Sequence, residues 1–145
     1  MADGFKFNID NLDEVKKAIS RRGELIEAAG EYALTQVAFA VEMQAKQNAM
    51  TGSHRRGQGH IPGTGPGPNR VTGALVRSIH TEPRKGFGTY TASVFPTMIY
   101  ARAVELGNPR WKSGVKYPYL RPAADKVRPL ANRIFTAAFM QKWRG

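Results

Sequence analysis

The chain has 145 residues, a length that fits one domain able to bury a core without disulfide or metal support. It contains no cysteine, which excludes disulfides and thiolate metal sites. No apolar run approaches the ~18 residues that a membrane span needs, and residues 1–10 lack the order of a signal peptide. We therefore expect synthesis in the cytoplasm and no membrane association.

The net charge of +11 is distributed unevenly. Residues 1–50 carry six Lys or Arg against eight Asp or Glu, a net charge of −2. Residues 51–145 carry sixteen against three, a net charge of +13. This asymmetry predicts one acidic and one basic surface. A basic half suits either nucleic acid or an acidic protein neighbour, and the composition leaves both open.

The first fifty residues predict two helices. Asn11 is suited to cap the first, and Arg21, Arg22 and Gly23 resemble a helix C-terminus. The second should run over about residues 24–50. A single helix from residue 12 to 50 would be about 58 Å long at ~1.5 Å per residue, whereas a compact domain of this size is roughly 38 Å across. This comparison favours a break at Gly23.

The second predicted helix carries two neighbouring apolar stripes. Such a broad apolar arc is typical of a central core helix, and the alternative is that one stripe is partly a subunit interface. The first stripe comprises Ile26, Ala29, Ala33, Val37 and Ala40, and the second comprises Leu25, Tyr32, Phe39, Met43 and Met50.

We expect residues 51–70, which are rich in Gly, Pro and Arg, to form a flexible loop within the single domain 1–145. Nearly half of its positions are Gly or Pro, and it contains no acid. Arginine in a glycine-rich setting can follow a phosphate backbone without reading bases, so the loop could face DNA or a lumen. A solvated loop, or one ordered against a neighbouring subunit, is the alternative. Its candidate contact residues are His54, Arg55, Arg56, His60 and Arg70.

The remaining elements complete an α+β pattern. Residues 71–79 predict a short helical turn that leads into a strand, residues 83–88 a turn, and residues 89–95 an alternating strand. A short helix over 98–106 and a long helix over 119–143, kinked or restarted at Pro129, follow. The expected fold is a small twisted antiparallel sheet covered by a long N-terminal helix and a C-terminal helix.

The sequence predicts no enzyme, cofactor or metal site. The three histidines lack metal-ligand spacing with carboxylates, and only Glu82, Glu105 and Asp125 supply acids after residue 50. Acid–base pairs or a two-metal site would need more convergent carboxylates. The Gly-Thr-Gly-Pro-Gly-Pro run at residues 63–68 lacks the Gly-Lys-Ser/Thr ending of a phosphate loop.

Three segments together resemble a known family. The first, Thr-Gly-Ala-Leu-Val-Arg-Ser-Ile at 72–79, is similar to a Thr-Gly-x-Leu-x-x-Ser-Ile entry into a sheet. Tyr-Ala-Arg-Ala-Val-Glu-Leu-Gly at 100–107 and Tyr-Pro-Tyr-Leu-Arg-Pro-Ala at 117–123 resemble a Tyr-Ala-x-x-Val-Glu-x-Gly element and a Pro-x-Leu-Arg-Pro-Ala entry to a final helix. In this order the segments resemble the head–tail joining or tail-completion (neck) proteins of tailed bacteriophages. The longer insertion before residue 71 departs from that family's pattern.

The resemblance implies a structural virion protein of the neck. It implies a homo-oligomeric ring, expected to be a hexamer, between the head connector or stopper and the tail terminator or tail tube. Genomic DNA would pass through the lumen with non-specific contact. The alternative is a basic, non-enzymatic DNA-binding protein.

Aromatic residues and arginine are the types expected at interface hot spots, and Glu105 should pair with a nearby arginine within or between subunits. The tyrosine at 119 could instead belong to the core. The candidate subunit interface comprises Tyr100, Arg102, Glu105, Trp111, Tyr119 and Arg121.

Overall fold

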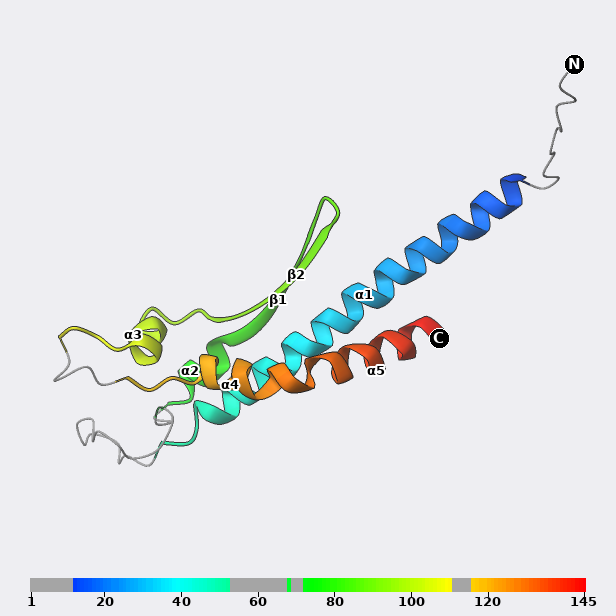
Figure 1. Cartoon of the computed structure of the whole chain (residues 1–145). Helices are drawn as coiled ribbons and strands as arrows, with labels where there is room; N and C mark the ends of the chain where they lie inside the picture. Colours follow the sequence, from blue (N-terminus) through cyan, green and yellow to red (C-terminus); the bar gives the residue numbers. More distant parts are fainter. Residues whose placement is uncertain (1–11, 53–67, 69–71, 111–115) are drawn as a thin grey trace, which may run out of the picture.

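Figure 1 shows the computed structural model, in which residues 12–52, 68, 72–110 and 116–145 are described. The described elements confirm the predicted α+β class: a long N-terminal helix, an antiparallel hairpin and a C-terminal helical arm. In chain order they are α1 (Leu12–Asn48), α2 (Ala74–Ser78), β1 (Ile79–Gly86), β2 (Thr89–Pro96), α3 (Ala101–Leu106), α4 (Leu120–Val127), the 3-10 turn η2 (Arg128–Leu130) and α5 (Ala131–Arg144).

Helix α1 is one continuous helix of 37 residues, so the predicted break at Gly23 is wrong. At ~1.5 Å per residue α1 is about 55 Å long. Gly23 has nothing within 4 Å of the position that a Cβ would occupy, so no neighbour forces the chain to turn there. A glycine inside a helix costs only ~1 kcal/mol, which the flanking helix formers can offset. The length comparison failed because it assumed that α1 stays inside a compact body.

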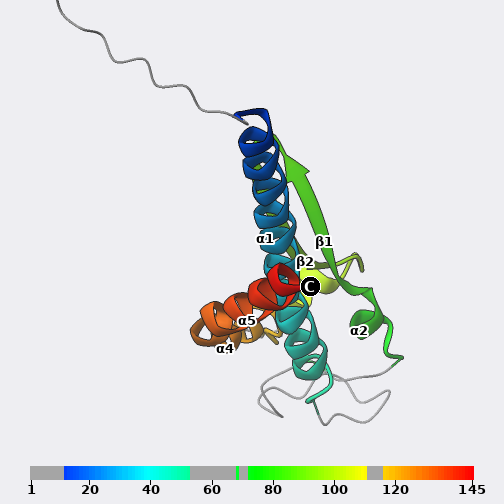
Figure 2. The same ribbon diagram turned by 90° about the vertical axis from the view of Figure 1, so that its right-hand side faces the viewer.

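The N-terminal half of α1 projects beyond the rest of the molecule. In Figure 1 it extends past the hairpin tip and past the C-terminal end of α5. The side chains described over residues 13–28 are all exposed. The C-terminal half lies between the hairpin on one side and the α4–α5 arm on the other (Figure 2). Burial therefore divides one helix into a projecting half and a packed half.

Small side chains allow the packed half to approach its neighbours closely. Ala29, Ala33 and Ala45 are fully buried, and Ala49 is nearly so. The main core lies where α1 meets α2, the base of the hairpin, α3 and α4. Among the described residues its only large, fully buried side chains are Tyr119 and Ile79. The core is thus thin and depends on close backbone approach rather than on bulky side chains.

The hairpin is longer than the sequence predicts. Strands β1 and β2 pair in antiparallel register from Ile79↔Pro96 to Gly86↔Thr89, so the predicted turn over 83–88 shrinks to two residues. A proline inside β1 is tolerated because of its register. The Thr97 N–H donates to the Ser78 carbonyl (3.2 Å), and hydrogen-bonded pairs alternate along an antiparallel ladder. Pro83, opposite Ala92, then falls on a non-hydrogen-bonded pair.

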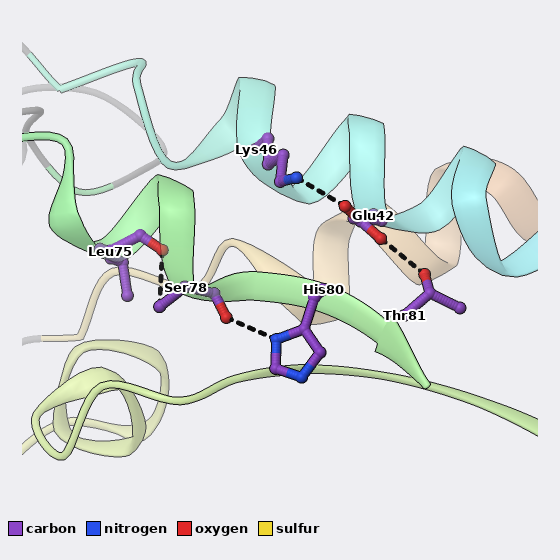
Figure 3. Close-up of polar contacts among 6 residues, drawn as sticks. All are labelled: Glu42, Lys46, Leu75, Ser78, His80 and Thr81. Carbon is purple, nitrogen blue, oxygen red and sulfur yellow. Dashed lines mark hydrogen bonds and ion pairs between the residues drawn. The ribbon is translucent and has the colours of Figure 1, made fainter. Parts of the chain in front are cut away.

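Polar contacts fasten β1 to α1 (Figure 3). The Thr81 hydroxyl donates to Glu42 Oε2 (2.7 Å), and Lys46 pairs with the other carboxylate oxygen of Glu42. Burial by itself raises the pKa of Glu42, but the hydrogen bonds from Lys46 and Thr81 outweigh it and hold that pKa below 4.5. Nearer the hairpin tip, Tyr90 of β2 and Thr35 of α1 share a hydrogen bond of 2.8 Å between their hydroxyls, and Lys85 of β1 pairs with Glu31 of α1.

The C-terminal arm restarts where the sequence predicts. Helix α4 ends at Val127, η2 contains Pro129, and α5 continues from Ala131. Proline lacks the N–H that a continuous α-helix would need, so a 3-10 turn separates α4 from α5 at this point. In α5 the rings of Phe135, Phe139 and Trp143 stack in succession, with centroids 6.1 and 6.3 Å apart.

Candidate subunit interface

Glu105 joins α3 to the start of α4. Its Oε2 accepts the backbone N–H groups of Tyr119 (2.7 Å) and Leu120 (3.0 Å), and its Oε1 accepts that of Arg121 (2.9 Å). The first N–H groups of a helix have no partner inside the helix, and the positive end of the helix dipole favours a carboxylate there. Glu105 therefore caps α4 from a separate element.

Within one subunit this role takes the place of the predicted pairing of Glu105 with arginine, and pairing between subunits remains a prediction. Across the described residues no ion pair joins Glu105 to Arg102, Arg110 or Arg121. The carboxylate binds backbone because the first N–H groups of α4 are free and lie within hydrogen-bond distance of it. The same junction carries a second link, since the Tyr117 N–H donates to the Val104 carbonyl (2.8 Å).

Tyr119 is a core residue and cannot present a surface. Its exposed fraction is 0%, and Tyr117 beside it is also buried. The Tyr119 hydroxyl has no hydrogen-bond partner among the described residues. Burial, followed by the negative charge of Glu105, raises the pKa of this phenol above its usual range. Of the two interpretations of Tyr119 that the sequence allows, the core one is correct.

Three other predicted interface residues lie together at the surface. Tyr100 precedes α3 and is 41% exposed, Arg102 is exposed on α3, and Arg121 is exposed in the first turn of α4. The predicted Trp111 lies outside the described residues, as do all five candidate residues of the 51–70 loop, His54, Arg55, Arg56, His60 and Arg70. Their proposed contacts remain predictions.

Helix α3 is flanked by two hollows. The first, of about 300 Å³, lies between the end of β2, α3 and the start of α4. It has a largely apolar wall with Arg102 at its edge, and its lining residues are Pro96, Met98, Ala101, Arg102, Glu105, Leu106, Tyr119 and Leu120. The second, of about 400 Å³, lies on the other side of Arg102 and Leu106. We call the first one the α3 pocket.

Several large apolar side chains around α3 are exposed, which the sequence did not predict. Ile99 is 99% exposed and Leu106 is 63% exposed, and both lie beside these hollows. At the far end of the hairpin Phe87 is fully exposed. An aromatic residue between Gly86 and Gly88 was the available signal, because turns are usually polar.

The second apolar stripe of α1 is also largely uncovered, in contrast to the core interpretation. Its members Leu25, Phe39, Met43 and Met50 are each more than 40% exposed. The hairpin and the α4–α5 arm pack on α1 without covering these four side chains. The interface alternative for this stripe remains a prediction.

Within the described part of the chain, no group of three or more His, Asp or Glu side chains could hold a metal ion. No helix in the described ranges is long and apolar enough to cross a membrane. The geometry around α3 offers apolar surface, a pocket and arginines, which suit protein contact.

Comparison with known proteins adds no relative. A scan against protein-family models, a search of curated proteins and a search of solved structures each found no match. The resemblance to phage neck proteins therefore rests on the three quoted segments alone.

Proposed function

We propose that this chain is a non-enzymatic structural subunit of the neck of a tailed-phage virion. It would form a ring, expected to be hexameric, as a tail-completion or head–tail joining protein between the head connector and the tail tube. The observation that carries the proposal is the amount of large apolar surface that a lone subunit leaves open along α1 and around α3. Exposed large apolar side chains that gather on one part of a surface are typical of protein contact sites.

The three family-like segments support the proposal because each contains a residue with a specific structural role. In the first, Gly73 has a φ of 76° and begins the turn through α2 into β1. In the second, Glu105 caps α4. In the third, Tyr119 fills the core. The residues that carry the resemblance thus build the joint between hairpin, α3 and α4, and leave the surfaces around that joint for partners.

A test uses a phage that encodes this chain. Deleting its gene should yield full heads and finished tails that are not joined, and supplying the chain in trans should restore joined particles. Electron microscopy of the lysate reads out both states. Normal, infectious virions from the deletion phage would overturn the proposal.

The basic surface of the C-terminal arm supports one alternative function, which is DNA binding. Its exposed basic residues outnumber its one acid, Asp125, six to one; they are Arg121, Lys126, Arg128, Arg133, Lys142 and Arg144. A basic DNA-binding protein should bind duplex DNA as an isolated chain. Its log affinity should then fall by ~0.9 per phosphate contact as log salt rises. Fluorescence anisotropy across a salt series measures this, and a neck subunit should bind weakly or not at all.

A further inference from the structure

The hairpin tip carries an aromatic side chain that its own subunit does not use. The turn between β1 and β2 consists of Phe87 and Gly88, and Gly88 has a φ of +68°. A Cβ on Gly86 would lie 2.8 Å from Thr89 Oγ1, so a larger residue there would displace the Thr89 side chain. Gly88 permits a tight turn, from which the Phe87 ring projects into solvent with 107% exposure.

The opposite end of the same hairpin carries a hollow suited to an apolar side chain. The α3 pocket begins at Pro96, the last residue of β2, and has about 300 Å³ of open volume. Met98, Leu106 and Leu120 contribute apolar wall. Strand β2 has eight residues, so at ~3.4 Å per residue the pocket lies roughly 25 Å from the tip. Phe87 therefore cannot enter the pocket of its own subunit.

The charges at the two ends are complementary. Around the tip, Glu27, Glu31 and Glu82 outnumber Arg84 and Lys85, a net charge of −1, and these side chains form ion pairs with one another. Of the described charged residues, Arg102 and Glu105 line the α3 pocket, and the exposed Arg121 follows its lining residue Leu120. These three carry a net charge of +1, and the Glu105 carboxylate accepts backbone N–H groups. A second copy that presents its tip to this pocket meets a surface of opposite sign.

We propose that Phe87 of one copy inserts into the α3 pocket of the next copy. Because knob and pocket lie at opposite ends of one subunit, the contact is head-to-tail and repeats from copy to copy. Such a contact closes into a ring when the rotation between copies allows it. The inference rests on the proposed neck function and names the contact that would link its subunits. The two ideas can fail separately, as the outcomes below show.

The test exploits a chain without cysteine. Thr89→Cys places a thiol next to the tip, and Thr97→Cys places one between Pro96 and Met98 at the pocket. Both threonines are exposed and both replacements are nearly isosteric. A maleimide cross-linker shorter than the hairpin cannot join the two thiols within one copy. The double variant should yield a ladder of dimers, trimers and larger species on a denaturing gel.

Two controls identify Phe87 as the cause. Adding Phe87→Ala should reduce the ladder and weaken association about 10- to 100-fold, the effect of losing one buried phenyl group. Circular dichroism should stay unchanged, because the ring is fully exposed in the free subunit. Thr89→Cys combined with Thr136→Cys, an exposed threonine on α5, should give no ladder. The ladder should also weaken as salt is raised.

The outcomes are distinct. A ladder that Phe87→Ala leaves unchanged overturns this contact but leaves a ring-forming subunit in place. A pattern that stops at dimers, or the absence of cross-linking at low salt, overturns the head-to-tail arrangement. Unjoined heads and tails in the deletion phage would still support the neck function in either case. Complete virions from that phage would overturn the neck function itself.

Discussion

The two halves of α1 have similar helix-forming sequences but opposite surroundings. Over residues 13–28 the described side chains are all exposed, whereas Ala29, Ala33, Ala45 and Ala49 of the packed half are buried. Local propensity and capping favour a helix in both halves, but only tertiary contacts stabilise it cooperatively. The packed half thus carries the stability of the subunit, and the projecting half is available to neighbours in an assembly.

The largest difference between the halves should come from one substitution made in each. Ala45→Leu introduces bulk where the exposed fraction is 0%, so it should lower the free energy of unfolding by about 1–3 kcal/mol. Ala18→Leu, in the projecting half, should change it by less than about 0.5 kcal/mol. Urea denaturation followed by circular dichroism measures both. Equal effects would mean that the two halves are packed alike.

Removal of the cap on α4 should be nearly as damaging. Glu105→Ala leaves three N–H groups without their charged acceptor and should cost about 2 kcal/mol. That corresponds to a fall in Tm of about 4–8 °C. The Tm of Glu105→Gln should lie between those of the unmodified chain and Glu105→Ala, because glutamine keeps an acceptor but loses the charge. Glu24→Ala, an exposed glutamate on the projecting half, is the control and should leave Tm in place.

Glycine replacements separate local from cooperative stability. Gly30 and Gly23 both lie in α1 with open space where a Cβ would go. Gly30→Ala, at the start of the packed half, should raise the free energy of cooperative unfolding by ~0.5–1 kcal/mol. Gly23→Ala should raise helix content and amide protection near residue 23 without moving Tm, since the projecting half can fray alone. A matching rise in Tm for Gly23→Ala would show that the projecting half unfolds with the core.

The smallest expected effect is the pH dependence from Glu42. Because the folded-state pKa of Glu42 is lowered, its contribution is present above the ordinary value of 4.5. It is lost as the pH falls through the folded-state pKa. Glu42→Gln should therefore flatten the loss of stability below about pH 4.5, and Lys46→Met should remove only the ~0.3–0.5 kcal/mol of an i,i+4 pair at neutral pH. Thermal unfolding at several pH values tests this, and an unchanged acid profile in Glu42→Gln would exclude the role.

The candidate site was only partly predictable. The sequence placed Tyr100, Arg102, Glu105 and Arg121 in one region, and the structure brings them together at the α3–α4 junction. It could not tell that Glu105 binds backbone N–H groups, because that depends on how two helices meet in space. The exposure of Ile99 was equally out of reach, since composition does not say which apolar residues the subunit itself covers, whereas the glycines beside Phe87 did offer a signal.

Local sequence patterns were enough to predict the class of fold, the ends of most elements and the restart of the C-terminal arm at Pro129. These features follow from local physics, namely alternation in β2, helical spacing and the missing N–H of proline. Helix α1 continues through Gly23, where no neighbour lies within 4 Å of a Cβ position, so the flanking helix formers sustain it locally. Tertiary contacts decided that Tyr119 is core and that Glu105 is a cap, because burial and capping need a partner surface. Those partners come from residues far apart in the chain.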